Sequence, residues 1–312
     1  MKLIKSSFEI IEQEIPVRKM DDYSGEHFRE EYINNMYKHI EKCARICYKS
    51  EHRITENSYK SFVKRLIDSK HYSTLEHGVV YLGFPSTKHI DIYKKYKDNH
   101  FSKVNTAIYD GAYDFITTNY RVIIENHWED DLQYLCEPTE YHEKRYTVLL
   151  HSCIHTYKDL TRHRHMSFSI ESTRFVNYSN TDKFGEMKFV IPSWLNLEEG
   201  SYSNGKYLTE LGEKYINASK DVQRFLLRLQ GTELDYNELI ELGWQPQQAA
   251  EILPQCTAAD VVMSGFSSDW EFVFKLRTSY IHATGMPHPL VSEIMDPIYD
   301  EFIKRNYIHN LI

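Results

Sequence analysis

Cations, imidazoles and hydroxyls are concentrated in one stretch, residues 162–174, which reads RHRHMSFSIESTR. It begins with Arg162, His163 and Arg164 and ends with a hydroxyl-rich sequence around Ser172. Guanidinium groups beside hydroxyls grip phosphates or planar heterocycles through several charge-assisted hydrogen bonds. The same residues would also suit a solvated basic surface and a loop, so the stretch indicates an anion-binding site only together with other matching segments.

The overall composition excludes several classes of protein. Of the 312 residues, 41% are hydrophobic and 26% are charged, as in ordinary globular proteins. The net charge of −8 argues against a broad nucleic-acid interface, which needs a basic surface. An anionic ligand would therefore have to be held locally, and residues 162–174 are the candidate for that task.

The cysteines and the N-terminal residues indicate the cellular compartment in which we expect the protein. Five cysteines, an odd number without a CxxC pair, favour reduced thiols in the cytosol. The first residues lack the apolar run of a signal peptide, and no stretch reaches the length of a transmembrane helix. We therefore expect a cytoplasmic protein without membrane contact.

The hydrophobic pattern predicts one α+β domain over residues 1–312, with a core at about 30–305 and a peripheral insertion within 85–144. In this fold helices flank a central, largely antiparallel sheet. Apolar residues at helical spacing predict helices over 30–48, 57–70, 154–164, 206–230, 235–253, 268–277 and 290–305. Alternating or short buried runs predict strands over 78–84, 145–152 and 187–195.

Some segments have a less regular pattern. Residues 117–126 fit a strand and a helix equally, and residues 85–110 are polar and irregular. Ser73 and Glu76 fit a helix capping box. The Arg-His-Arg sequence is expected at the C-terminal end of helix 154–164, where cations complement the helix dipole.

The spacing of Arg162, His163, Arg164 and Ser172 resembles the signature of flavin-dependent thymidylate synthases, which is Arg-His-Arg, seven residues, then Ser. HYSTLEH (71–77) resembles the family's upstream His-Glu-Ser/Thr-x-x-Glu-His element except at Tyr72. The later helices of the family resemble two further segments, WQPQQAAEILP (244–254) and DWEFVFKLRTS (269–279). TNYRV, CEPTEYHEKR and NYSNTDKFGE resemble a longer bacterial and phage branch. Over roughly residues 40–300 the order and spacing of these matches agree with the family.

The resemblance implies a function and a set of site residues. The family methylates dUMP to dTMP with FAD, methylenetetrahydrofolate and NADPH, as homotetramers whose active sites are shared between subunits, and we expect the same here without a metal. The FAD-binding residues implied are His71, Ser73, Glu76, Arg162, His163, Arg164 and His288. The dUMP-binding residues implied are Asp159, Arg162, Ser172, Thr173, Arg174 and Arg277.

Arg277 is the expected catalytic residue. Carbon 5 of the uracil must attack a folate-borne methylene, and a fixed guanidinium stabilises the negative charge that the ring develops. The family needs no enzyme nucleophile, and no Asp–His relay can be read around Ser172, so we assign Ser172 to binding.

Four positions depart from the family and support an alternative function. Ala250 replaces an arginine, Ile170 a Glu or Gln, Asp159 a Gln or Glu, and Phe272 a His or Asn. A diverged homologue could therefore modify another pyrimidine nucleotide, add a hydroxymethyl group, or bind its ligand without turnover.

The histidines suggest a second alternative, a metal-dependent phosphohydrolase. Its candidate ligands are His151, Cys153, His155, His163 and His165. An adjacent His-Asp pair and a complementary second cluster are missing, which weighs against a metal site.

Overall fold

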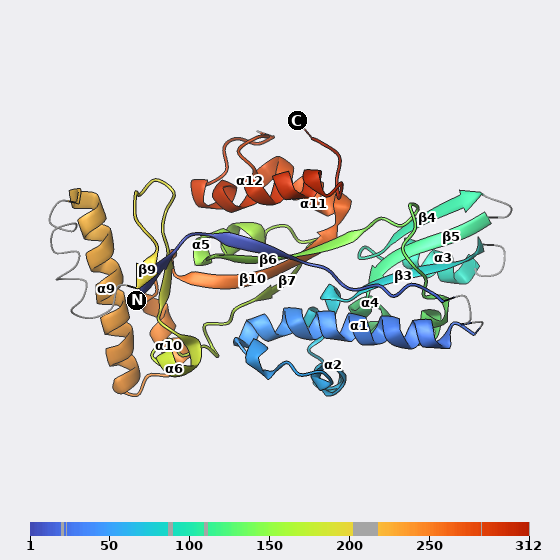
Figure 1. Cartoon of the computed structure of the whole chain (residues 1–312), viewed down its shortest axis with the longest axis horizontal. Helices are drawn as coiled ribbons and strands as arrows, with labels where there is room; N and C mark the ends of the chain where they lie inside the picture. Colours follow the sequence, from blue (N-terminus) through green and yellow to red (C-terminus); the bar gives the residue numbers. More distant parts are fainter. Residues whose placement is uncertain are drawn as a thin grey trace.

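The largest sheet has four antiparallel strands in the order β2–β6–β10–β7. The computed structural model describes residues 1–19, 22, 24–86, 90–108, 112–201, 218–281 and 283–311. The strands of this sheet are β2 (Ser7–Ile11), β6 (Arg145–Cys153), β7 (Ser167–Ile170) and β10 (Ala258–Phe266). Helices lie on both of its faces (Figure 1), which confirms the α+β class with a central antiparallel sheet.

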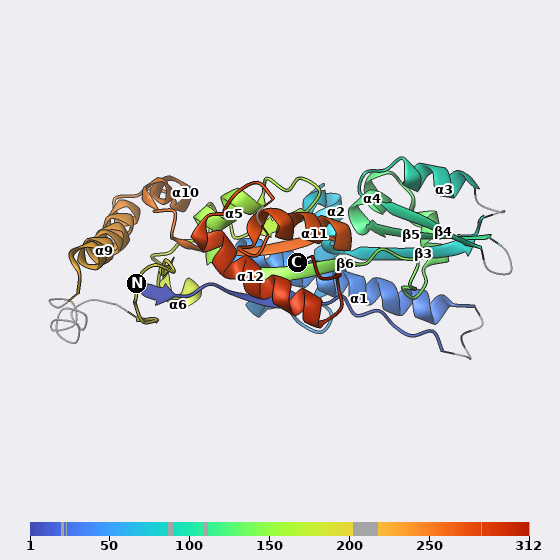
Figure 2. The same ribbon diagram turned by 90° about the horizontal axis from the view of Figure 1, so that it is seen from above.

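Helices cover both faces of this sheet, and apolar side chains pack on each face. Val148 and Leu150 of β6 pack into one core with helices α11 (Ser267–Arg277) and α12 (Pro289–Lys304). On the other face Leu149 contacts α1 (Glu26–Arg45), beside which lies α2 (Ser58–Asp68). Figures 1 and 2 show the two helix layers with the sheet between them. Side chains alternate between the two layers along each strand.

The predicted irregular segment 85–110 contains regular structure, so that prediction was wrong. It holds α3 (Ile90–Lys97) and β4 (Lys103–Ile108), and β4 is an edge strand of the antiparallel sheet β3–β5–β4. The other two strands are β3 (Val79–Pro85) and β5 (Ala112–Asn119). Only Ala107 of β4 is buried, so the strand carries almost no apolar alternation. The ambiguous segment 117–126 ends β5 and then forms α4 (Tyr120–Glu125), which Asn119 caps.

A third sheet, β8–β1–β9, lies near the long helix α9 (Figure 1). Its strands are β1 (Lys2–Ile4), β8 (Lys188–Val190) and β9 (Gly200–Ser201). Instead of two helices broken near residue 231, α9 (Lys220–Glu241) is continuous, and α10 (Pro246–Ala249) and the 3₁₀ turn η6 (Ala250–Ile252) follow it. Gly231 costs about 1 kcal/mol relative to alanine, but buried Leu226, Leu229 and Tyr236 hold the helix in place. Residues 206–217 of the predicted helix lie outside the described residues.

Two short segments next to the predicted site differ from expectation. Helix α5 (Ile154–Leu160) ends before the Arg-His-Arg sequence, which lies in a turn. The 3₁₀ helix η3 (Tyr72–His77) begins after His71, and no side chain caps it, so the predicted capping box is absent. Glu76 instead pairs with Arg121 at 2.6 Å. The remaining short helices are η1 (Ile46–Tyr48), η2 (Glu51–Arg53), η5 (Glu129–Tyr134) and α6 (Thr181–Phe184).

All five cysteines are free thiols. Within the described ranges, no helix combines the length and the apolar character needed to cross a bilayer.

One ion pair makes the stability of the central sheet depend on pH. His151 of β6 lies opposite Asp260 of β10, with 2.7 Å between Nδ1 and Oδ1. The hydrogen bond to Asp260 raises the pKa of His151. Burial works against ionisation of Asp260, but its hydrogen bond with His151 and the charge of Lys49 leave its pKa below the ordinary value. The pair is therefore fully charged between about pH 4 and about pH 6.5, and its contribution is lost as pH rises through the raised pKa of His151.

We predict that His151→Gln lowers the free energy of unfolding more at pH 5.5 than at pH 8.5. The difference should be no more than about 1 kcal/mol, because His151 is more than one-third exposed and water screens the pair. Urea unfolding at both pH values measures it. His27→Gln, which removes an exposed pair with Glu31 on α1, is the control. An equal loss at both pH values in His151→Gln would contradict the prediction.

Candidate active site

Strand β7 separates the two halves of the 162–174 stretch. The residues before β7 line a cavity of about 420 Å³, which we call the motif hollow. Its lining consists of Arg162, His163, Arg164, His165, Met166, Asp269 and Phe272. Ser172, Thr173 and Arg174 follow β7 and lie against η1, where the Ser172 N–H donates to the Cys47 carbonyl at 3.0 Å. Within one chain, the two halves therefore do not form a single pocket.

Arg277 is held in a fixed position beside the motif hollow. Its Nε donates to His163 Nε2 at 3.0 Å, and its Nη2 donates to the Asp159 carbonyl at 3.0 Å. The Asp159 carboxylate lies 3.6 Å from Nη1. Helix α5 supplies Asp159 and helix α11 ends at Arg277, so the packing of these helices sets the geometry. The structure thus brings together three of the predicted site residues.

His163 acts as a neutral acceptor for Arg277. Burial lowers the pKa of His163 to about 4, and the Arg277 charge adds to the shift. At neutral pH the ring carries no charge, and Nε2 must carry the lone pair that accepts from Arg277. Phe272 lies edge-on to the ring with 5.9 Å between the centroids. A neutral histidine leaves the positive charge of Arg277 available to a ligand.

A second cavity, of about 490 Å³, has a strongly cationic lining, and we call it the cationic hollow. The protonatable residues that line it are Arg45, His52, Arg53, Arg65, His71 and Lys183. No carboxylate belongs to its described lining, although Glu41 accepts from Arg45 at 2.6 Å nearby. Ser50 and Ser69 add hydroxyls, and Tyr48, Phe62 and Phe175 add aromatic rings. Such a set suits an anionic ligand with a flat ring.

The turn after β7 adjoins the cationic hollow. Phe175 lines the hollow, and its ring lies 5.1 Å from that of Tyr48. The Arg174 guanidinium lies 5.6 Å from the Phe175 ring centroid and is exposed. The predicted flavin residue His71 and the predicted nucleotide residue Arg174 therefore lie near the same cavity.

The central sheet lies between the two groups of site residues. His71 precedes η3, which contacts α1 and α2 on one face. Met166 of the motif hollow belongs to the core with α11 and α12, on the other face (Figure 1). His71 and Arg277 are thus on opposite sides of the sheet. A ligand would have to reach round β7, the edge strand, to touch both in one chain.

The other predicted flavin residues have diverse surroundings. Ser73 is exposed, and Glu76 is half-buried and paired with Arg121. His288 caps α12 by accepting from the Leu290 N–H at 3.2 Å, and its ring is tilted against that of His155 with 3.9 Å between the centroids. Burial lowers the pKa of His288, with a further contribution from His155. His288 thus lies with α5 and α12, away from η3.

The structure describes the surroundings of the three unusual positions other than Asp159. Ile170 lies opposite Val261 in the sheet and packs against the core under α11 and α12, where a carboxylate would be buried without a partner. Ala250 begins the turn η6 after α10 and is half-buried. Phe272, 59% exposed, contacts His163 and lines the motif hollow.

The cations from the N-terminal third of the chain were missed by sequence reasoning. Arg45, Arg53 and Arg65 belong to three separate helical segments, so no linear motif joins them. The available signal was their number close to HYSTLEH in a chain of net charge −8.

The histidine cluster proposed for a phosphohydrolase does not converge. His151 pairs with Asp260, His155 bonds Gln255 at 3.0 Å, and His163 accepts from Arg277. Among the described residues no three His, Cys, Asp or Glu side chains are arranged to hold a metal ion. The structure gives this alternative no support.

Comparison with known proteins adds a family. Residues 142–285 match the family described as Thymidylate synthase complementing protein. The flavin-dependent thymidylate synthase of Haloarcula marismortui is 31% identical over 116 residues, which are 34% of this chain and 42% of that protein. That of Corynebacterium efficiens is 27% identical over 121 residues, 39% of this chain and 44% of that protein. The matches thus span less than half the length of these relatives.

Solved structures resemble the chain more loosely. A UMP/dUMP methylase, PolB from Streptomyces cacaoi, bound with 5-Br dUMP, has a TM-score of 0.42 and 15% identity over 97% of this chain and 93% of that chain. The thymidylate synthase ThyX of Helicobacter pylori, complexed with FAD and dUMP, has a TM-score of 0.35 and 13% identity over 87% and 91%. The family match, 142–285, contains the whole 162–174 stretch together with Asp159 and Arg277. Through this segment the chain is similar to the flavin-dependent thymidylate synthases.

Proposed function

We propose that the chain converts dUMP to dTMP in the cytoplasm, with FAD, methylenetetrahydrofolate and NADPH, as one domain with an insertion at 85–144. The observation that carries the proposal is the arrangement of Arg277, neutral His163 and Asp159 inside the family segment. The reaction needs a fixed positive charge beside the pyrimidine ring, because negative charge develops on that ring, and Arg277 can supply it.

The cationic hollow fits part of a flavin dinucleotide. Its cations and hydroxyls suit a diphosphate, and its rings suit a flat heterocycle. Arg45, Arg53, Arg65 and His71 would hold the phosphate end. When bound, the flavin supplies the redox chemistry and the transfer chemistry that no side chain of this protein provides.

Arg174 and Ser172 would bind the nucleotide phosphate. The family's phosphate arginine is replaced by Ala250, so the neighbouring cations of the hollow have to supply more of the attraction. Lys183 also lines the hollow. Charged hydrogen bonds of this kind contribute about 1.5–3 kcal/mol each.

Arg277 would stabilise the pyrimidine anion. His163 is neutral and takes up none of the positive charge of Arg277, whereas the Asp159 carboxylate, 3.6 Å from one guanidinium nitrogen, offsets part of it. The two hydrogen bonds of Arg277 fix the plane of the guanidinium before the substrate arrives, so little reorganisation is needed in the transition state.

A second copy of the chain would complete the site. His71 and Arg277 lie on opposite faces of the sheet, so residues from different subunits must meet if both touch the same ligands. This supports the expected homotetramer with shared active sites, which sedimentation measurements on the purified protein would test.

The second candidate is a diverged homologue that acts on another pyrimidine nucleotide. Ile170 and Ala250 favour it, because both remove a polar group from positions that usually face the ligands. Incubation of the protein with FAD, the folate donor, NADPH and either dUMP, UMP or dCMP, followed by mass spectrometry of the nucleotide, separates the two. A gain of one methyl on dUMP supports the proposal, whereas no mass change on any nucleotide rejects it.

Arg277→Lys should lower turnover by about a hundredfold or more, because lysine keeps the charge but loses the planar fork. Reduction of bound flavin by NADPH should be preserved, since that step needs no charge on the pyrimidine. Stopped-flow absorbance follows the flavin, and product formation follows turnover. Lys275→Ala, an exposed residue of the same helix, is the control. Normal turnover in Arg277→Lys would contradict the assigned role.

Arg174→Ala should weaken dUMP binding by about tenfold or more, and Arg65→Ala should weaken FAD binding by a similar factor. Each variant removes one cation from the cationic hollow or its rim. Calorimetry with each ligand measures both effects. Lys64→Ala, the exposed neighbour of Arg65 that does not line the hollow, should change neither affinity. Unchanged affinities for dUMP and FAD in the two arginine variants would show that the cationic hollow binds neither ligand.

A further inference from the structure

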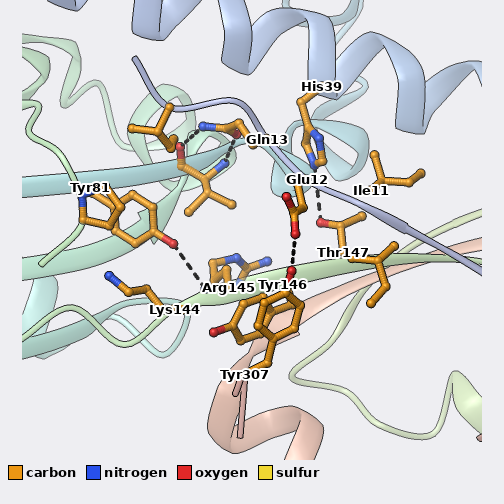
Figure 3. A pocket seen from close by; sticks show the side chains of 14 residues that line it. Ile11, Glu12, Gln13, His39, Tyr81, Lys144, Arg145, Tyr146, Thr147 and Tyr307 are labelled. Carbon is orange, nitrogen blue, oxygen red and sulfur yellow. Dashed lines mark hydrogen bonds between the residues drawn. The ribbon is translucent and has the colours of Figure 1, made fainter. Parts of the chain in front are cut away.

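A third cavity, the tyrosine cavity, shares no lining residue with either hollow. It encloses about 270 Å³ between β6 and the segment that follows β2. Figure 3 shows Tyr81 and Lys144 on one side and His39 on the other. The rings of Tyr146 and Tyr307 lie together at a further side of the same space.

The cavity is lined by two cations that form no direct ion pair among the described residues. Arg145 is 6% exposed, and none of the ion pairs among the described residues includes it. Burial lowers the pKa of Arg145 and that of Lys144. Glu12 also lines the cavity, but its carboxylate accepts from the Tyr307 hydroxyl and from Arg305. Nearby carboxylates, with Asp269 first among them, offset part of the burial of Arg145, and the Lys144 Nζ donates to the Thr139 carbonyl at 2.6 Å. A buried cation that lies in no ion pair is still costly, so an anion bound here would be favoured.

Two buried nitrogens of the lining residues have no hydrogen-bond partner. They are Nε of Arg145 and Nδ1 of His39. His39 is 5% exposed, and its Nε2 lies 3.3 Å from the Thr147 hydroxyl. Burial lowers the pKa of His39 to about 4, so the ring is neutral at neutral pH. Buried polar groups are almost always paired in native proteins, so the Arg145 Nε, which is a donor, indicates a missing acceptor. The Nδ1 of His39 donates or accepts according to its tautomer and can pair with either kind of ligand atom.

The rest of the lining is flat and apolar. The rings of Tyr146 and Tyr307 stack with 3.9 Å between centroids and 12° between planes. Ile10, Ile15 and Val79 complete the apolar wall. The volume lies below the range of about 300–1,000 Å³ that is usual for pockets binding drug-sized ligands. A flavin or a folate is therefore too large for it.

We propose that the tyrosine cavity binds a small organic anion, a monocarboxylate with a flat, apolar body. Its carboxylate would meet Arg145 and Lys144, and its body would pack against the paired rings of Tyr146 and Tyr307. An inorganic anion would leave the apolar wall without a partner. The site does not depend on the proposed methyltransferase activity, because its residues are not shared with either hollow.

Benzoate is the probe, with benzamide as its neutral counterpart of the same shape. Calorimetry on the full-length protein should give at least about tenfold tighter binding of benzoate, the factor expected for one charge-assisted hydrogen bond. Equal affinities, or no binding of benzoate, would overturn the proposal. Inorganic phosphate should compete weakly; competition as strong as that of benzoate would show a plain anion site and also overturn it.

Two substitutions in the lining test whether benzoate binds in the tyrosine cavity. Lys144→Met should weaken benzoate binding by about tenfold or more, and Ile15→Trp should abolish it by filling the cavity. Lys64→Met, on the surface of α2, should leave it unchanged. Arg145 itself is left in place because it also donates to the Glu76 carbonyl and to Ser167 at 3.2 Å each. Wild-type benzoate affinity in both cavity variants, or a crystal structure with benzoate in which only water occupies the cavity, would reject the site.

Discussion

A chain of buried hydrogen bonds through His77 fixes the segments that carry the candidate site. His77 ends η3 and is completely buried. Its Nδ1 lies 2.7 Å from the Ser264 hydroxyl of β10, and its Nε2 lies 2.9 Å from the Ser169 hydroxyl of β7. Burial lowers the pKa of His77, so the ring stays neutral. One hydroxyl can then accept from its protonated nitrogen while the other donates to its unprotonated nitrogen. The His71–His77 segment and the strand of the 162–174 stretch are thereby locked to one sheet.

This lock determines what one chain can and cannot assemble. It holds η3 against one face of the sheet, while α5 and α11 hold Arg277 on the other. Because cores are close-packed and do not deform continuously, a small shift of η3 would not bring His71 to Arg277. The rigidity that positions each half of the site therefore also keeps the halves apart, and only another subunit or a ligand that passes the edge strand β7 can join them.

The sequence predicted those features that are encoded locally. The strand 145–152 and the helix 268–277 follow from apolar spacing, and the structure agrees. The sequence assigned His163 to the flavin and Asp159 and Arg277 to the nucleotide, and only the fold shows that the three side chains are in contact. Edge strand β4 was missed because its exposed side chains carry no alternation, and helix α9 was divided at Gly231 because tertiary burial, invisible in the sequence, outweighs a local penalty. The cationic hollow was missed because its arginines come from separate helical segments that only the fold brings together.

Charge distribution links the candidate site to the tyrosine cavity. A chain of net charge −8 repels anions at long range, so any anionic ligand must be attracted by local fields. Salt screens charges beyond roughly 10 Å, which leaves the sparsely compensated cations of the cationic hollow and of the tyrosine cavity to act over short distances. In both places aromatic rings lie beside the cations, and they exclude water and strengthen each charge-assisted hydrogen bond. The net negative charge thus leaves any attraction of an anion to the local cations of these two cavities.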